Sequence, residues 1–308
     1  MVTKHIIGHK SPDTDTTCSS IAYGELLSQK GEDVKVIKLG ELNNETKFVL
    51  EKFGIEEPET LSVLEDGSQI ILMDHNEAKQ SIDGREKLKI VQIIDHHRFD
   101  FSVKEPLMIR AEPLGSTCSI VAKMYFESGL NLSKEIAGIL ISSILSDTLN
   151  FKSATTTKED KEIVAKLNEI VKIEDLNSFA LEMFNAKSDL GDIDVDELVK
   201  LDYKIFEING KRVGVGVMET TNPDYGLDRK EEIIAELKRV EKEDSLDFVF
   251  FSIIDILKEI NFTLFSNEAG EDLLKRGFNA TVESEVASLG RILSRKKQII
   301  PKFEEFMK

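Results

Sequence analysis

Histidines and aspartates that could bind metal ions are concentrated in the first half of the chain. All five histidines of the 308-residue sequence lie within the first 97 residues, and four of the five lie in or beside aspartate clusters. The clusters are His9 to Asp15 (HKSPDTD), Asp74-His75, Asp95-His96-His97 and Asp147. Imidazole and carboxylate without thiolate suit a borderline cation such as Mn²⁺ or Co²⁺, whereas an all-oxygen set would favour Mg²⁺ or Ca²⁺. The residue types therefore predict a metal site.

The number of candidate ligands predicts a pair of ions. The candidates are His9, Asp13, Asp15, Asp74, His96 and Asp147. This set is too large for one catalytic ion that must keep open positions. Two ions about 3.5 to 4 Å apart, bridged by carboxylates, fit better, and such pairs generate a hydroxide that attacks phosphorus. The implied chemistry is phosphoryl hydrolysis.

Two of the clusters also have less specific explanations. Asp13 follows a proline and could belong to a solvated turn. Alternatively, Asp13 and Asp15 are alternate residues of an extended loop, and each meets a different ion. Asp147 could lie on the polar face of an amphipathic helix, although a carboxylate in the apolar run 136–149 is costly to bury unless it is paired or coordinated.

The Asp-His-His run combines three different roles. In an extended conformation, His96 and His97 project to opposite sides, so that one binds metal while the other faces substrate. Asp95 then orients an imidazole from outside the ligand shell. His75, beside Asp74, is a further candidate for such support, although nothing in the sequence fixes its role.

The elements that must position these residues alternate strand and helix. Strands are predicted at 5–9, 33–39, 69–74 and 90–95, and helices at 16–30, 44–53 (with Asn44 as its cap), 116–128, 134–150, 157–171 and 175–186. The nearly continuous branched apolar character of the strands suits a parallel α/β sheet covered on both faces. Three of these strands end at His9, Asp74 and Asp95. Because ligands bind at the carboxyl ends of strands in open α/β sheets, we expect the three ends to meet at one crevice.

The length of the chain predicts two domains, because a single core rarely organises this many residues. We place the N-terminal metal-binding domain at 1–187, a polar hinge linker at 188–194 and the C-terminal domain at 195–308. The first domain is expected to have a mainly parallel sheet flanked by helices. The second has strand candidates at 204–208, 212–218, 248–254 and 261–265 and a helix at 228–242, which predict a smaller mixed sheet with helices.

Composition limits the partners and the compartment. No stretch approaches the roughly 20 apolar residues of a membrane span, and no signal-peptide segment opens the chain, so we expect a cytoplasmic protein without a membrane partner. Cys18 and Cys118 have no paired spacing and are predicted to be buried free thiols. The net charge of -17 opposes binding of long nucleic acid, although a small multivalent anion could still bind beside local cations or metal ions.

The motifs resemble those of the DHH phosphoesterases, and among them the manganese-dependent (family II) inorganic pyrophosphatases. The matching segments are GHKSPDTD (Gly8 to Asp15), MDHNE (Met73 to Glu77), DHHR (Asp95 to Arg98), SDTLNFKS (Ser146 to Ser153) and SRKKQ (Ser294 to Gln298). The resemblance spans nearly the whole chain. It implies hydrolysis of pyrophosphate to two orthophosphates by a metal-bridging hydroxide at the domain interface, and a homodimer formed through the N-terminal domain.

The resemblance also implies roles for individual residues. His9 and Asp13 would hold one Mn²⁺, Asp15 and His96 the other, and Asp74 and Asp147 would bridge both, with Co²⁺ or Mg²⁺ as possible substitutes. The phosphate-binding residues would be His97, Lys204, Arg295 and Lys296, and the C-terminal domain would be of the DHHA2 type. A cationic cluster suits pyrophosphate, because Arg offers forked hydrogen bonds and Lys a point charge. The alternative for the basic residues near 295 is an ordinary solvated face of a C-terminal helix.

Two other classes of protein remain as alternatives. Other DHH enzymes act on short nucleic acids or polyphosphate, but those nucleases carry a histidine-containing motif in the C-terminal domain, and here no histidine follows residue 97. A non-catalytic, metal-stabilised binding protein would bind metal without releasing phosphate.

Overall fold

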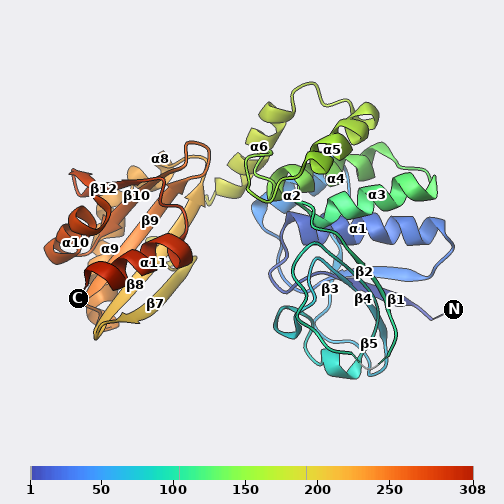
Figure 1. Ribbon diagram of the computed structural model, residues 1–308, viewed down its shortest axis with the longest axis horizontal. Helices are drawn as coiled ribbons and strands as arrows, with labels where there is room; N and C mark the ends of the chain where they lie inside the picture. Colours follow the sequence, from blue (N-terminus) through green and yellow to red (C-terminus); the bar gives the residue numbers. More distant parts are fainter. Residues whose placement is uncertain (1, 104, 192, 308) are drawn as a thin grey trace. The chain divides into compact units, whose positions relative to one another are not determined.

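The computed structural model describes residues 2–103, 105–191 and 193–307, with the side chains of Lys296 and Lys297 excepted. The chain forms two compact units, Met1–Lys187 and Ser188–Lys308. Each has its own six-stranded sheet with helices (Figure 1), as the predicted α/β fold class requires. The predicted hinge at 188–194 includes residue 192, which lies outside the described residues, and its role stays a prediction.

The sheet of the first unit is parallel and its strand order reverses between β1 and β4. The strands are β1 (Lys4–Ile7), β2 (Val34–Lys38), β3 (Glu59–Thr60), β4 (Gln69–Met73), β5 (Lys89–Asp95) and β6 (Met108–Ala111), in the order β3-β2-β1-β4-β5-β6. At such a reversal the connections leave neighbouring strands toward opposite faces, which opens a crevice at their carboxyl ends. His9 follows β1 and Asp74 follows β4, so both residues lie at the carboxyl edge of the sheet where the strand order reverses.

Helices cover one face of this sheet and loops cover the other. The helices are α1 (Thr14–Gln29), α2 (Asn44–Lys52), α3 (Thr117–Ser128), α4 (Lys134–Asp147), α5 (Lys158–Val171) and α6 (Leu176–Ser188), and Figure 1 shows α1, α3, α4 and α5 stacked on one side. On the opposite face, Leu72 and Ile93 pack against Leu61, Leu88 and Phe101 from the loops, which include the 3-10 turns η1 (Ala78–Gln80) and η2 (Arg85–Lys87). Burial on both faces explains the continuous apolar character of the strands.

Several helix ends differ from the prediction by one to three residues, and at two of them the structure shows the cause. The cap of α2 is Asn43, whose Oδ1 accepts the amide hydrogen of Thr46 at 2.8 Å, so the assignment of Asn44 as the cap is wrong. Helix α4 ends at Asp147 rather than at residue 150, because the backbone at residues 149–151 has positive φ angles of 48°, 51° and 65°. A turn of this kind cannot continue a right-handed helix.

The second unit has a mixed sheet with helices on both faces. Its strands are β7 (Tyr203–Ile208), β8 (Lys211–Thr220), β9 (Phe248–Asp255), β10 (Ile260–Phe265), β11 (Thr281–Glu283) and β12 (Val286–Gly290), in the order β11-β12-β10-β9-β8-β7, and only β8 and β9 are parallel neighbours. Consecutive side chains of β9 point to opposite faces of the sheet and pack against different helices. Phe250 packs with Leu273 and Phe303 on one face, and Phe251 packs with Ile233 on the other.

The helices of the second unit were only partly predicted from the sequence. They are α7 (Val195–Lys200), α8 (Asp224–Leu227), α9 (Lys230–Glu243), α10 (Glu268–Phe278) and α11 (Ile300–Phe306), and a π-helical turn η3 (Arg295–Ile299) precedes α11. The sequence prediction found α9 but missed α10, although Asn267 caps that helix through the amide of Gly270 at 2.8 Å. No described helix is long and apolar enough to cross a membrane.

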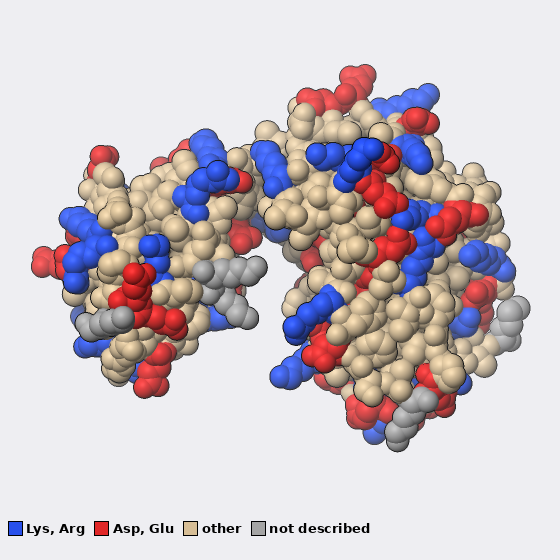
Figure 2. All heavy atoms as spheres, in the orientation of Figure 1, with Lys and Arg blue, Asp and Glu red and all other residues tan. Residues whose placement is uncertain are grey.

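The surface carries charges of both signs. On the face in Figure 2, acidic and basic side chains are interspersed over both units. Cys18 and Cys118 are free and buried, as predicted.

Candidate metal centre

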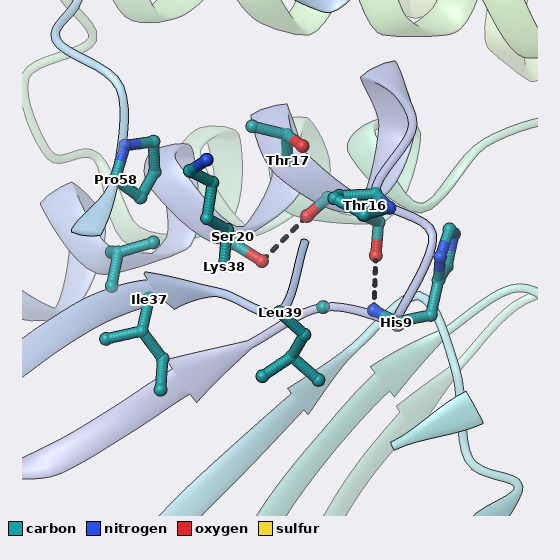
Figure 3. Close-up of a pocket in the computed structure, with 11 residues that line it drawn as sticks. His9, Thr16, Thr17, Ser20, Ile37, Lys38, Leu39 and Pro58 are labelled. Atoms are coloured by element: carbon teal, nitrogen blue, oxygen red, sulfur yellow. Dashed lines mark hydrogen bonds between the residues drawn. The ribbon is translucent and has the colours of Figure 1, made fainter. Parts of the chain in front are cut away.

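Thr16, in the first turns of α1, joins the two strand ends at the switch point. Its Oγ1 accepts the amide hydrogen of His9 at 3.1 Å (Figure 3) and donates to the carbonyl of Met73 at 3.3 Å. Gly8 makes this approach possible, since a Cβ at that position would lie 2.5 Å from Thr16 Oγ1. His9, just beyond β1, and Met73, the last residue of β4, are thereby held side by side.

His9, Asp13 and Asp74 form the first group of potential ligands. His9 Nε2 lies 3.4 Å from Asp13 Oδ2 and 3.6 Å from Asp74 Oδ2. Asp13 caps α1 with its other oxygen, which accepts the amide hydrogen of Thr16 at 2.9 Å. Burial disfavours the charged imidazole, but hydrogen bonds with the two carboxylates raise the pKa of His9 to about 10. Two carboxylates thus face one imidazole nitrogen, which marks a place for positive charge.

Asp15 is fully buried in the first turn of α1. It accepts four hydrogen bonds: from Ser116 Oγ (2.7 Å), Ser143 Oγ (2.6 Å) and Cys118 N (3.0 Å) to Oδ1, and from Thr117 N (2.6 Å) to Oδ2. Burial opposes ionisation, but the charge of His96 and these hydrogen bonds lower the pKa of Asp15. Asp13 and Asp15 do belong to different groups, as expected. The reason given from the sequence is wrong, because one is a helix cap and the other is helical rather than in an extended loop.

His96 completes a second group with Asp15 and Asp147. Its Nδ1 lies 2.9 Å from the carbonyl of Leu114, a contact that selects the tautomer in which the neutral ring carries its lone pair on Nε2. Nε2 lies 3.9 Å from Asp15 Oδ2 and 3.7 Å from Asp147 Oδ2, and it is buried without a hydrogen-bond partner among the described residues. An imidazole with its tautomer fixed in this way, facing carboxylates, has the donor chemistry of a transition-metal site. The residues present therefore fit Mn²⁺.

Asp147 is the last residue of α4, and its side chain is 26% exposed. Burial and the neighbouring charges of Asp15 and Asp74 raise the pKa of Asp147 well above its usual range. A carboxylate in such surroundings ionises readily only beside a cation. Asp147 belongs to the second group alone, so its role as a bridge between two ions stays a prediction.

Asp74 connects the two groups. Its Oδ2 faces His9 at 3.6 Å and its Oδ1 faces His96 at 3.5 Å, and Thr117 Oγ1 donates to Oδ1 at 2.8 Å. The backbone at Asp74 has a φ of 62°, a left-handed conformation that Asp tolerates better than most residues. Burial and repulsion by Asp15 raise the pKa of Asp74 to about 7. This arrangement supports the predicted bridging carboxylate.

His97 is oriented by Asp95. Asp95 Oδ1 accepts hydrogen bonds from the backbone amide and from Nδ1 of His97, both at 3.0 Å, and Asn76 Nδ2 donates to the other oxygen at 2.7 Å. The hydrogen bond with Asp95 outweighs burial and raises the pKa of His97 to about 9. Hydrogen bonds from His97 and Asn76 likewise overcome burial and lower the pKa of Asp95.

The expected opposite orientation of His96 and His97 is wrong. Strand β5 ends at Asp95 and the chain bends there, so the two rings lie 4.2 Å apart in an edge-to-face contact. Their exposure nevertheless differs, since the side chain of His96 is 11% exposed and that of His97 is 53% exposed. Only His97 is open to a ligand from solvent.

His75 is buried behind the first group. Its Nδ1 lies 2.9 Å from the carbonyl of Met73, and its ring meets that of His9 edge-to-face at 6.5 Å. Burial lowers the pKa of His75 to about 4, so the ring is neutral and donates through Nδ1. From this position the ring of His75 can support His9 by packing against it, and this supporting role stays a prediction.

Two of the predicted phosphate-binding residues lie together in the second unit. Arg295 Nη2 bonds Asp202 Oδ1 at 2.7 Å, and Nη1 donates to the carbonyl of Val215 at 3.1 Å. Val215 pairs with Lys204 across β7 and β8, so the exposed Lys204 and the guanidinium share one edge of the sheet. The side chain of Lys296 lies outside the described part of the chain.

Sequence reasoning missed the hydroxyls and amides that hold the ligands. Ser143 lies one helical turn before Asp147, and this polar residue in an apolar run was a usable signal. Asp160 had no such signal: its carboxylate accepts the amide hydrogen of Gly115 at 3.0 Å and the Ser119 hydroxyl at 2.5 Å, which fixes the start of α3. The beginning of α3 in turn supplies three of the four hydrogen-bond donors to Asp15.

Comparisons with known proteins match the chain to one family over nearly its whole length. Residues 4–144 match the DHH family, N-terminal domain, and residues 181–306 match the DHHA2 domain. The manganese-dependent inorganic pyrophosphatases of Methanocaldococcus jannaschii and Bacillus subtilis are each 38% identical to this chain, over 98% of both sequences in each pair.

Solved structures extend the likeness to the fold. A Methanococcus jannaschii crystal structure, assigned provisionally to the family II inorganic pyrophosphatases, is similar with a TM-score of 0.69 and 37% identity, over 99% of this chain and 100% of that one. An exopolyphosphatase-related protein from Bacteroides fragilis shares the fold alone, with a TM-score of 0.52 and 16% identity over 99% of this chain and 91% of that one. From the matched domains and the full-length identity, the chain belongs to the family of manganese-dependent inorganic pyrophosphatases.

Proposed function

We propose that this chain hydrolyses inorganic pyrophosphate to two orthophosphates with a pair of Mn²⁺. The proposed ligands are His9, Asp13, Asp15, Asp74, His96 and Asp147. The observation that carries the proposal is Asp74, whose two oxygens each face a different histidine at 3.5 to 3.6 Å. One carboxylate shared between two donor groups is the arrangement that a two-ion centre requires.

Bound ions would supply an activated water and neutralise charge on the phosphoryl oxygens. The chain's own contribution begins with His97. Its pKa of about 9 keeps the imidazole protonated near neutral pH, and Asp95 engages Nδ1, so that the proton on Nε2 can be donated to a phosphate oxygen. That hydrogen bond strengthens as charge accumulates on the leaving phosphate.

The second unit supplies further cations in this proposal. Lys204 is an exposed point charge, and Arg295 offers a guanidinium whose orientation Asp202 fixes at 2.7 Å. Lys296 is proposed as a third cation from its place in the motif. We further propose that 1–187 and 195–308 act as separate domains joined by a hinge at 188–194, and that they close on the substrate.

The decisive experiment is phosphate release from pyrophosphate by the purified protein, titrated with Mn²⁺, Co²⁺ and Mg²⁺. Mn²⁺ should support the fastest turnover, and Co²⁺ or Mg²⁺ should substitute. Tripolyphosphate and a short oligonucleotide serve as competing substrates in the same assay. Comparable Mn²⁺-dependent turnover of either competitor would contradict the specific proposal.

Assembly and location complete the proposal. We propose a homodimer formed through the first unit, where the edge strand β6 exposes Met108 (38%) and Ile109 (45%) to solvent. A sheet edge with exposed apolar residues favours pairing with a second copy. Cytoplasmic location and the absence of nucleic-acid and membrane partners stay predictions, and the two free cysteines favour a reducing compartment.

A further inference from the structure

Glu45 is a buried carboxylate that the proposed reaction does not use. It lies in the first turn of α2 and is 1% exposed. Its Oε2 accepts hydrogen bonds from Thr14 Oγ1 at 3.0 Å and from Ser146 Oγ at 2.9 Å. One oxygen atom therefore joins the start of α1 to the end of α4.

The two hydroxyl groups lie next to proposed ligands in the sequence. Thr14 separates Asp13 from Asp15, and Ser146 precedes Asp147. These three aspartates come from two helices, and Glu45 connects both helices through one pair of hydrogen bonds. A shift at either hydroxyl would move a carboxylate of the centre.

The surroundings of Glu45 are costly for stability. Lys187 Nζ forms an ion pair with Oε2 at 3.8 Å that offsets part of the cost, but Oε1 is buried without a hydrogen-bond partner among the described residues. An unbonded buried carboxylate oxygen destabilises a fold, and an apolar residue of similar size would avoid that cost. The position of Glu45 is better explained by a role at the site than by the stability of α2.

We infer that Glu45 is a positioning residue of the metal centre, which holds the Asp13–Asp15 segment and Asp147 at the spacing that two ions require. This inference rests on the proposed function, because the centre it serves is the proposed Mn²⁺ site. Glu45 acts through Thr14 and Ser146 and touches neither ion nor substrate.

The test compares Mn²⁺ affinity in Glu45→Ala and Glu45→Gln, measured as free Mn²⁺ by electron paramagnetic resonance without substrate. The alanine variant loses both hydrogen bonds, and we expect Mn²⁺ affinity about tenfold weaker, as is usual when a partner outside the ligand shell is removed. The glutamine variant keeps an acceptor oxygen of the same reach, and we expect it to recover most of that loss.

Two control variants on the same helix separate positioning from stability. Val49→Ala opens a cavity at a fully buried position of α2 and should lower the melting temperature without changing Mn²⁺ affinity. Glu51→Gln makes the same charge change at an exposed position and should alter neither property. If Glu45→Ala fails to fold, Ser146→Ala removes one of the two hydrogen bonds, and we expect a severalfold loss of affinity.

The inference is overturned if folded Glu45→Ala, or Ser146→Ala in its place, binds Mn²⁺ as the parent does. It is also overturned if Val49→Ala weakens Mn²⁺ binding as much as the Glu45 variants do. Failure of the proposed function looks different: the parent would bind two Mn²⁺ and yet release no phosphate from pyrophosphate.

Discussion

The hydrogen bond from His97 to Asp95 predicts a specific change in the pH dependence of catalysis. In the proposed mechanism His97 acts as a cation, so activity is present below its pKa and is lost as the pH rises through it. The ordinary pKa of a histidine is 6.5, and the hydrogen bond with Asp95 is the largest cause that raises the pKa of His97 to about 9. Asp95→Asn keeps an acceptor oxygen and removes the negative charge.

The expected magnitude follows from which causes survive in the variant. The negative charges of Asp74 and Asp15 also raise the pKa of His97, but metal ions bound at the site would neutralise those charges. Burial acts in the opposite direction and lowers the pKa of His97. The side chain of His97 is 53% exposed, so water also screens the pair. We expect the pKa in Asp95→Asn to fall to roughly 7 to 8, and the loss of activity at high pH to begin correspondingly lower.

The assay is kcat/KM for phosphate release between about pH 6 and 10 at saturating Mn²⁺. Proton NMR can follow the His97 ring with diamagnetic Mg²⁺ in place of the paramagnetic Mn²⁺, because the chain has only five histidines. Asp100→Asn is the matched control: it makes the same charge change at an exposed position five residues along the same segment. The reasoning is refuted if Asp95→Asn and the parent lose activity at the same pH, or if Asp100→Asn shifts the profile equally.

Three further predictions concern ligands, packing and pH. His97→Gln should lower turnover far more than Mn²⁺ affinity, whereas Asp74→Asn should impair both; equal loss of metal in the two variants would contradict the assigned roles. In Gly115→Ala the added Cβ would lie 2.6 Å from Thr148 Cγ2 and 2.9 Å from Asp160 Oδ2, so chemical denaturation should show a loss of about 1–3 kcal/mol. A variant as stable as the parent would show that Thr148 and Asp160 move aside for the added methyl group without a cost in stability. The pKa of Asp74 is about 7, whereas that of an ordinary aspartate is 3.8, so between these values the folded metal-free protein holds a proton that the unfolded chain releases. Between about pH 4 and 7 the melting temperature in EDTA should therefore fall relative to that of Asp74→Asn, a comparison that cancels the opposing effect of His75, whose pKa burial lowers to about 4. A rise in this difference with pH would count against the pKa assignment.

The meeting of the ligands at one place could be predicted from the sequence. Three apolar runs each end in His or Asp, and the carboxyl ends of parallel strands lie at one edge of a sheet. The prediction that His9, Asp74 and Asp95 lie near one another therefore needs no knowledge of strand order. The reversal between β1 and β4 is a property of the whole sheet, and local patterns do not contain it.

The groups that tune the ligands could not be predicted in this way. Ser116 and Ser143 both bond Asp15, although they lie 101 and 128 residues away in the sequence. Their role depends on how α3 and α4 pack against α1. Ser143 does stand out as a polar residue in an apolar run, but that pattern does not identify Asp15 as its partner. The bend after Asp95 was missed for a similar reason: its carboxylate bonds the amide of His97 and so ends the strand, and that bond follows from a side-chain orientation.

Proton and metal binding are coupled at this centre because its carboxylates share a buried volume. Asp15 stays ionised through four hydrogen bonds, whereas Asp74 has a pKa of about 7, and burial together with repulsion by Asp15 and Asp74 raises the pKa of Asp147 well above its usual range. His9, with a pKa of about 10, holds a proton at the nitrogen that would face the first ion. An ion that binds here must displace such protons, so Mn²⁺ affinity should rise with pH and binding should release protons to the buffer. Hydrogen bonds thus keep Asp15 charged before any ion binds, and the binding of Mn²⁺ would ionise Asp74 and Asp147.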